Sequence, residues 1–348
     1  MITRVEIENF KAIEKLSMDF TSRLTVIVGP NGSGKTSILQ AANSFGKASR
    51  TANATLFRRI GATVSPWVKI VTPLGGVEFN ADNSESPRER SFLGDATAAD
   101  IPGTVLLHCD FDQMSQPSMH GSSLQSDASN LSAVLAGLKL NDPEKFSLIE
   151  ETLCRIIPQI VRIRFDQVPM RGLQLVSTES SRSGYQEMPT GPSLASGFRL
   201  LFDTALVAGI PADSASEGTL LSLGIITAIV MRDSEFENVV LVDDLDASLH
   251  PSAQKSLIEA IRKLLEMRPK LQVIATSHSP YLLDSLTHDE IRLTTLDDQG
   301  RVVCGTLMDH PDFERWKDEM TPGEMWSMFG EKWLTAPKES VPVIEVAT

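Results

Sequence analysis

Short apolar runs alternate with polar segments along this chain, and their periods predict an α/β protein. Alternation over residues 3–10 predicts a half-exposed strand, whereas the continuous run LTVIV (24–28) predicts a buried strand. A glycine-rich turn follows, and apolar residues at helical spacing then occupy 35–45. The chain thus begins with strand, turn and helix in that order.

The rest of the chain mixes both periods. Helices are predicted at 131–140, at 142–157 with Asp142 as N-cap and Pro143 in its first turn, and at 219–231. Polar runs at 113–130 and 177–193 predict loops, the first of them mobile, and helices are expected to alternate with strands from residue 194 onward. No heptad pattern or internal repeat is visible. The predicted strands lie at 67–71, 76–80, 103–111, 159–165, 172–177, 238–244, 271–278 and 291–296.

Composition limits the class of protein. The 348 residues are 41% hydrophobic and 22% charged, as in ordinary globular proteins. The net charge of −13 argues against a surface that binds nucleic acid all over, but leaves a local basic groove open. Small candidates for that groove are Arg58 with Arg59, and Arg88 with Arg90, although solvated loop charges are the favoured interpretation.

Cysteines and apolar runs indicate the compartment. Cys109, Cys154 and Cys304 stand far apart, so the sequence supports neither a zinc knuckle nor a disulfide framework. The N-terminus shows no apolar leader segment, and the longest apolar run, 219–231, is too short to cross a bilayer. We therefore expect a cytoplasmic protein without a membrane partner.

The turn after the first buried strand carries the most specific motif. Its sequence GPNGSGKTS, from Gly29 to Ser37, fits the phosphate-binding P-loop pattern G-x-x-x-x-G-K-[ST]. Glycines let the backbone N–H groups approach phosphate oxygens; Lys35 reaches the β- and γ-phosphates and Thr36 binds Mg²⁺. The pattern predicts ATP and Mg²⁺ as cofactors. The residues expected to hold ATP are Pro30, Asn31, Gly32, Ser33, Gly34, Lys35, Thr36 and Ser37.

Two later strand ends carry candidate partners for the P-loop. The strand at 238–244 ends in Asp243, expected to hold the Mg²⁺ shell, and Asp244, expected to face the attacking water. His278 lies at the tip of the strand at 271–278 and is a candidate contact for the γ-phosphate. A solvated strand end and a structural histidine are the plainer alternatives.

These motifs together resemble the ABC-type ATPases of the RecF/OLD/SMC-like branch. The matching blocks are IENFKAIEKLSMDF (7–20), GPNGSGKTSILQA (29–41), SEGTL (216–220), VVLVDDLDASLHP (239–251) and VIATSHSPYLLD (273–284). The C-terminal run at 320–334 looks like the tail of small stand-alone ATPases of this branch.

The resemblance implies a fold and a division into parts. The fold is a P-loop NTPase of the ABC-ATPase head type, with a mixed central sheet, an antiparallel β subdomain and a helical lobe. A single domain spans 1–348. Its expected parts are an N-terminal lobe at 1–111, a helical insert at 112–215, the signature, Walker B, D-loop and switch-histidine segment at 216–306, and a helical tail at 307–348.

The resemblance also implies a dimer. SEGTL looks like a reduced signature loop in which Ser216 and Gly218 bind the γ-phosphate of ATP held by a second copy, so that two copies close head to tail. DASLH (246–250) would be the D-loop that couples the two sites, and His278 the switch histidine. Asp244, Lys35 and His278 would then carry the hydrolysis of ATP.

Three features depart from the family pattern or stay open. Asp244 replaces the usual Glu, so hydrolysis is expected to be slow. Gln113 is the candidate for the Q-loop glutamine and a Mg²⁺ ligand, with a plain loop residue as the alternative. LDDQG at 296–300 is interpreted as a hairpin turn rather than a metal site.

The resemblance leaves two functions open. The chain shows neither long coiled coils nor a TOPRIM nuclease segment after His278, so we expect an ATPase that regulates a separately encoded effector, a nuclease or toxin, in prokaryotic anti-phage defence. The alternative is a RecF-like ATPase that binds DNA during repair or recombination. A transporter subunit is disfavoured because the middle section resembles no transporter cassette.

Overall fold

The computed structural model describes residues 1–45, 65–80, 89–94, 102–119, 121–171, 194–232 and 237–336. Arg58, Arg59 and Arg88 lie outside these residues, as do the strand expected at 172–177 and the loop expected at 177–193. Arg90 belongs to a described strand.

A six-stranded sheet forms the centre of the molecule, with strand order β14-β13-β3-β12-β11-β7. All neighbouring strands are parallel except β13 and β14, so the sheet is mixed. The parallel strands therefore end at one edge, and this edge carries the P-loop. The strands are β3 (Leu24–Val28), β7 (Gly103–Leu107), β11 (Glu237–Val242), β12 (Gln272–Ser277), β13 (Ile291–Leu296) and β14 (Val302–Gly305).

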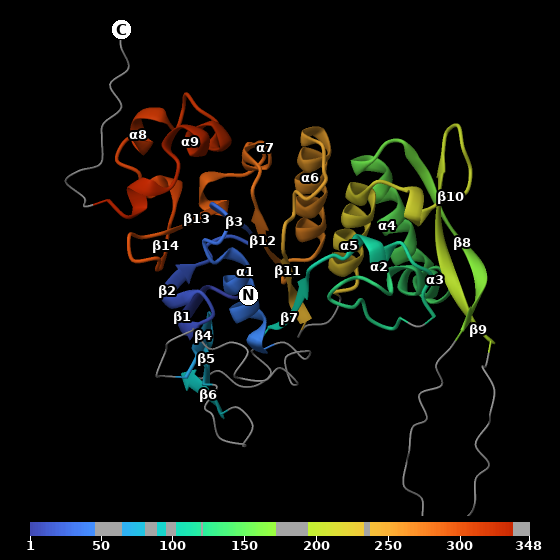
Figure 1. The fold of residues 1–348 in the computed structure, drawn as a ribbon, viewed down its shortest axis with the longest axis horizontal. Coiled ribbons are helices and arrows are strands. Elements are labelled where there is room, and N and C mark those ends of the chain that lie inside the picture. Colours follow the sequence, from blue (N-terminus) through green and yellow to red (C-terminus); the bar gives the residue numbers. More distant parts are fainter. Residues whose placement is uncertain are drawn as a thin grey trace, which may run out of the picture.

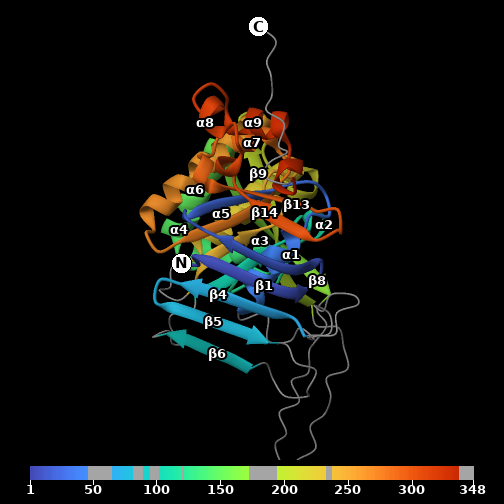
Figure 2. The same cartoon turned by 90° about the vertical axis from the view of Figure 1, so that its left-hand side faces the viewer.

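A second sheet is antiparallel and has the order β2-β1-β4-β5-β6. Figure 2 shows its strands stacked beside the central sheet. Helix α1 (Lys35–Ala42) contributes Ile38 and Leu39 to the core that this sheet shares with β3, β11 and β12. The strands are β1 (Arg4–Phe10), β2 (Ile13–Asp19), β4 (Trp67–Thr72), β5 (Gly75–Asn80) and β6 (Glu89–Gly94).

A helical lobe lies on the other side of the central sheet (Figure 1). It contains α2 (Phe111–Met114), α3 (Leu131–Asn141), α4 (Pro143–Ile156), α5 (Glu217–Val230) and α6 (Pro251–Met267). Every residue of α5 from Gly218 onward is buried, as expected of a helix that is apolar all round. Asp142 caps α4 by accepting from the N–H of Lys145, which confirms the predicted helix start.

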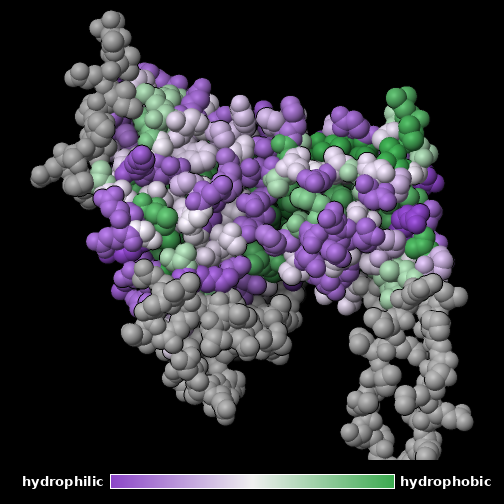
Figure 3. Space-filling view, viewed as in Figure 1, coloured by the Kyte–Doolittle hydropathy of each residue, from purple (hydrophilic) through white to green (hydrophobic). Residues whose placement is uncertain are grey.

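A small sheet with the order β10-β9-β8 closes the far end of this lobe. It consists of β8 (Ile160–Arg171), β9 (Leu194–Thr204) and β10 (Ile210–Pro211). Apolar residues gather on its surface in Figure 3, and Leu206 and Val207 are exposed between β9 and β10. Polar residues cover most of the rest of the face shown there.

The structure differs from the sequence expectation at β8, β9 and the loop at 113–130. The strand expected at 159–165 runs on to Arg171, and residues 194–204, where a helical pattern was expected to begin, form β9. Both differences arise because β8 and β9 pair with each other along their length. The loop at 113–130 was expected to be mobile, yet Leu124 and Ala128 are buried in the main core.

The C-terminal segment packs on the edge of the central sheet. It contains α7 (Pro280–Leu283), α8 (Phe313–Trp316) and α9 (Pro322–Phe329). The hairpin predicted at 296–300 joins β13 to β14, with Gly300 at φ +73°. Among the described residues, no helix has the length and apolar character needed to cross a bilayer.

Candidate nucleotide site

The P-loop leaves the end of β3 and leads into α1. Gly29, Gly32 and Gly34 have φ of +152°, +80° and +88°, a region that side chains disfavour. A Cβ at Gly29 would also lie 2.0 Å from the carbonyl oxygen of Thr294, so β13 leaves no room for one. Gly34 is the N-cap of α1 and offers no side-chain cap, which leaves the helix start open to an anion.

The side chain of Lys35 is held at this loop. Its Nζ donates to the carbonyl oxygens of Gly29 at 2.8 Å and Pro30 at 2.9 Å. The residue is 6% exposed, and burial lowers the pKa of its ammonium group. Phosphate oxygens are charged and bind an ammonium more strongly than neutral carbonyls, so the lysine is placed to exchange these partners for a phosphate.

Asp243 is the meeting point of three elements. Its Oδ1 accepts from the hydroxyl of Thr276 at 2.7 Å and from that of Thr36 at 3.2 Å. Its Oδ2 lies 3.3 Å from Nδ1 of His108, which directly follows β7. The P-loop threonine and the acid at the end of β11 are thus brought together as the sequence predicts, and the histidine joins them.

Asp244 and His278 face each other across the ends of β11 and β12. Nε2 of His278 lies 3.9 Å from Oδ1 of Asp244. Asp244 has φ +56°, and its N–H donates to Oγ1 of Thr276 at 2.8 Å, which holds this unusual backbone conformation. Burial, and then the charge of Asp243, raise the pKa of the Asp244 carboxyl. These positions suit an acid and an imidazole that act on one phosphate.

These residues surround a hollow of about 320 Å³. Residues of the P-loop, one residue of the β1–β2 turn, Asp244 and His278 line it. The sequence did not point to Ala12, because its place depends on the antiparallel sheet lying beside the P-loop. The lining residues are Ala12, Asn31, Gly32, Gly34, Lys35, Thr36, Ser37, Asp244 and His278.

Ser33 and Pro30 stabilise the P-loop. Oγ of Ser33 lies 2.8 Å from Oγ1 of Thr294 on β13, and the backbone N–H of Ser33 donates to the carbonyl oxygen of Pro30 at 3.2 Å. The P-loop is therefore anchored to the neighbouring strand as well as to its own carbonyls.

Gln113 stands apart from this hollow. It lies in α2, its backbone N–H donates to the carboxylate of Asp110, and it is exposed. It is not among the residues that line the hollow. The residue that contacts Asp243 from this side is His108.

Ser216 and Gly218 lie at the start of α5, and neither lines the hollow of its own chain. Ser216 is exposed and caps the helix by accepting from the N–H of Thr219 at 3.2 Å. A Cβ at Gly218 would lie 2.7 Å from the carbonyl oxygen of Ser248, and the hydroxyl of Ser248 donates to the carboxylate of Glu217. The signature turn therefore packs directly on the segment 246–250.

The donor set fits a divalent cation that bridges to phosphates. The hydroxyl of Thr36 and the carboxylate of Asp243 are the hard oxygen ligands that Mg²⁺ prefers. Within the described ranges, no group of three or more His, Cys, Asp or Glu side chains could hold a metal by itself. The cation would therefore rely on phosphate oxygens for the rest of its coordination.

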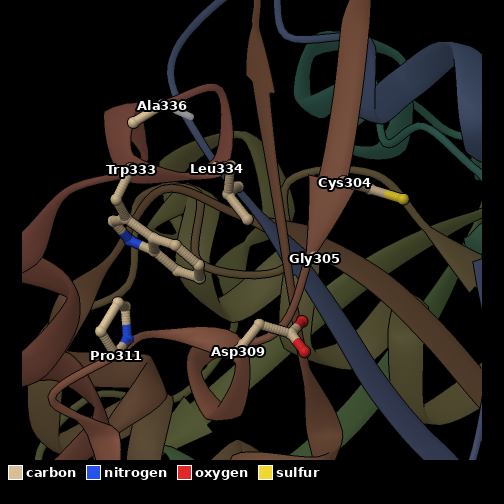
Figure 4. A pocket seen from close by; sticks show the side chains of 7 residues that line it. All are labelled: Cys304, Gly305, Asp309, Pro311, Trp333, Leu334 and Ala336. Carbon is tan, nitrogen blue, oxygen red and sulfur yellow. The ribbon is translucent and has the colours of Figure 1, made fainter. Parts of the chain in front are cut away.

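A second hollow, of about 520 Å³, lies between β14 and the C-terminal turn (Figure 4). Trp333, Leu334 and Ala336 bound it on one side, and Gly305 and Asp309 on the other. Oδ2 of Asp309 already accepts from the N–H and hydroxyl of Thr306 at 2.7 and 2.9 Å. Among the described residues that line this hollow, Asp309 is the one acid, and it is engaged in a local cap.

Comparison with known proteins gives a consistent result. A family model described as "AAA ATPase domain" matches residues 1–102, and one described as "AAA domain, putative AbiEii toxin, Type IV TA system" matches 130–284. The first match contains the P-loop, and the second contains the signature turn, Asp243, Asp244 and His278.

Individual relatives cover most of the chain. The Septu protein PtuA of Bacillus thuringiensis is 23% identical over 88% of this chain and 79% of its own length. The OLD nuclease of Thermus scotoductus is 24% identical over 87% of this chain, which spans only 63% of that protein. Among solved structures, an Smc head bound to the C-winged helix domain of ScpA aligns with a TM-score of 0.57 and 17% identity, over 88% of this chain and 98% of that one. At this identity the structural likeness shows the fold alone.

Proposed function

Because the chain is an ABC-type ATPase of the RecF/OLD/SMC-like branch, we propose that ATP closes two copies of it head to tail and that this closure regulates a separately encoded effector. ATP and Mg²⁺ would be held by the P-loop and Asp243 of one copy. Ser216 and Gly218 of the second copy would cover the γ-phosphate. Asp244 would polarise the attacking water, and His278 would steady the γ-phosphate, so that positioning and electrostatics carry the catalysis.

The observation that carries this proposal is the separation of the two halves of the site. The P-loop, Asp244 and His278 surround one hollow, whereas exposed Ser216 heads a buried helix and does not line that hollow. The start of a helix favours anions, because its backbone N–H groups and the positive end of its dipole point there. The exposed position of Ser216 supports the proposal that a second copy approaches the start of α5.

Contacts within one copy support coupling between the two sites. Glu217 and Gly218 of the signature turn touch Ser248, and Asp246 of the same segment accepts from the backbone N–H of His278 at 3.2 Å. A phosphate that displaces the signature turn would thus displace the segment 246–250 and with it the switch histidine. Through these contacts, ATP in one site is expected to influence hydrolysis in the other.

The dimer is tested by measuring mass with light scattering during size-exclusion chromatography. Asp244→Asn is expected to double in mass with ATP and Mg²⁺, because binding remains and hydrolysis is blocked. Asn tolerates the left-handed backbone found at Asp244, so the variant adds little strain. Lys35→Ala is expected to stay a monomer and to lose ATP binding. An Asp244→Asn protein that binds ATP but keeps its monomer mass would refute the closure.

The biological role is tested by finding the partner. The similarity to the Septu protein PtuA over most of both chains supports a role in anti-phage defence, with a nuclease or toxin as effector. We expect the product of a neighbouring gene to co-purify with the ATPase, and duplex DNA to leave ATP hydrolysis unchanged. Salt-sensitive stimulation by DNA, without a co-purifying protein, would instead favour the RecF-like role in repair.

A further inference from the structure

His108 occupies a defined place beside the acid that is expected to hold the cation. Strands β7 and β11 are parallel with Leu107 paired to Val242, so the next residues, His108 and Asp243, stand side by side at the strand ends. The N–H of Asp243 donates to the carbonyl oxygen of Leu107 at 2.9 Å, and the N–H of His108 donates to Ser126 at 2.8 Å. The backbone on both sides of the pair is therefore fixed.

The Asp243 carboxylate directs one oxygen toward each group of partners. Two hydroxyls, from Thr36 and Thr276, occupy Oδ1, whereas Oδ2 lies 3.3 Å from Nδ1 of His108. The imidazole, the carboxylate and the Thr36 hydroxyl thus form three neighbouring donors from three elements. A cation held by Thr36 and Asp243 would therefore have the imidazole of His108 as a neighbouring donor.

A purely structural role explains His108 poorly. The side chain of His108 is 72% exposed, whereas that of Asp243 is 3% exposed, so solvent reaches this contact from the side of the histidine. We therefore expect His108 to contact a ligand that reaches Asp243 from solvent.

We propose that His108 supplies an imidazole nitrogen ligand to the divalent cation bound with ATP, next to Thr36 and Asp243. This inference rests on the proposed binding of a cation with ATP and adds a ligand to that site. Imidazole is a softer donor than carboxylate or carbonyl oxygen, and Mn²⁺ accepts nitrogen ligands more readily than Mg²⁺. The site therefore favours Mn²⁺ more strongly than the same site with an oxygen donor at this position.

The experiment observes the metal rather than turnover. Full-length Asp244→Asn protein, which retains ATP, is loaded with Mn²⁺ and ATP and studied by pulsed electron paramagnetic resonance. Histidine labelled with ¹⁵N distinguishes an imidazole ligand from the backbone nitrogens of the P-loop. We expect a histidine nitrogen coupling that disappears in His108→Gln and persists in the matched control His278→Gln, since that ring faces Asp244.

Metal preference gives a second readout. Competition between Mn²⁺ and Mg²⁺ for the ATP-loaded protein is expected to show a preference for Mn²⁺ that falls about tenfold in His108→Gln. An unchanged preference together with no histidine coupling would overturn the inference and leave His108 as a hydrogen-bond partner of Asp243.

The same samples separate this inference from the proposed function. Nitrogen coupling without an ATP-dependent increase in mass would support the ligand and refute the dimer. An increase in mass without the nitrogen coupling would support the dimer and refute His108 as a ligand. If Mn²⁺ and ATP do not bind the protein at all, both proposals fall.

Discussion

Thr276 joins the two acids of the site through one hydroxyl group. That hydroxyl donates to Asp243 and accepts from the N–H of Asp244, and the residue is fully buried. Thr276→Val keeps the shape but leaves the N–H of Asp244 unpaired and removes one of the two hydroxyl donors to Oδ1 of Asp243, so we expect the free energy of unfolding to fall by about 1–3 kcal/mol. ATP hydrolysis should fall by at least about tenfold, because small misplacements of catalytic groups are costly.

Urea denaturation and phosphate release measure these two effects. Thr276→Ser is the matched control, since it removes one methyl group and keeps the hydroxyl. It should retain most of the hydrolysis that Thr276→Val loses. Equal rates for the two variants would show that the hydroxyl does not position Asp244.

Single residues of the site differ in how far the sequence could predict them. Lys35, Thr36 and Asp243 follow from local patterns, and the structure places Thr36 and Asp243 3.2 Å apart. His108 was missed because its contact depends on β7 pairing with β11, which lies far away in the chain. The strand was also predicted to run to residue 111, whereas β7 ends at Leu107 and His108 directly follows it.

At the scale of elements, α9 is packed directly on the helix that follows the switch histidine. The N–H of Gly323 in α9 donates to Asp284, and a Cβ there would lie 2.1 Å from the carbonyl oxygen of Pro280, the first residue of α7. Gly323→Ala must push α7 away, so we expect a loss of about 1–3 kcal/mol in the free energy of unfolding. Because Pro280 is two residues from His278, ATP hydrolysis should fall as well.

A second glycine provides the control for this substitution. Gly137 lies inside α3, and the nearest atom to a Cβ there is 3.9 Å away. Gly137→Ala is expected to leave hydrolysis unchanged and to stabilise the protein by up to about 1 kcal/mol, since alanine favours helix. If denaturation curves and hydrolysis rates of the two variants coincide, α9 does not constrain the switch segment.

Elements with strong local signals were predictable, and elements defined by pairing were not. Asp142 and Pro143 mark the start of α4 in the sequence, and the structure confirms it. Strand β9 carries no clean alternation, since Leu200, Leu201 and Phe202 are buried in succession. It becomes a strand because β8 supplies its hydrogen-bond partners, and that long-range information is absent from a local window.

For the whole molecule, the proposed closure predicts that two inactive variants restore each other. Lys35→Ala damages the P-loop half of the site, and Ser216→Arg blocks the signature half from the exposed N-cap of α5. Losing this cap costs only about 1 kcal/mol, so the second variant should still fold. In a head-to-tail pair of the two variants, one site receives both damaged halves and the other site receives both intact halves.

Each variant alone is therefore expected to hydrolyse almost no ATP, whereas an equal mixture regains activity. A pair of two Lys35→Ala copies would hold no ATP, so only mixed pairs contain an intact site, one of the two in each pair. Complete mixed pairing would therefore give about half of the normal rate, provided that the sites work independently. A lower rate per mixed dimer, with the mixed fraction measured by mass spectrometry, would measure the coupling through Ser248 and Asp246. Mixing experiments that restore nothing, with dimers of mixed composition shown by mass spectrometry, would mean that the signature turn does not complete the site of a second copy.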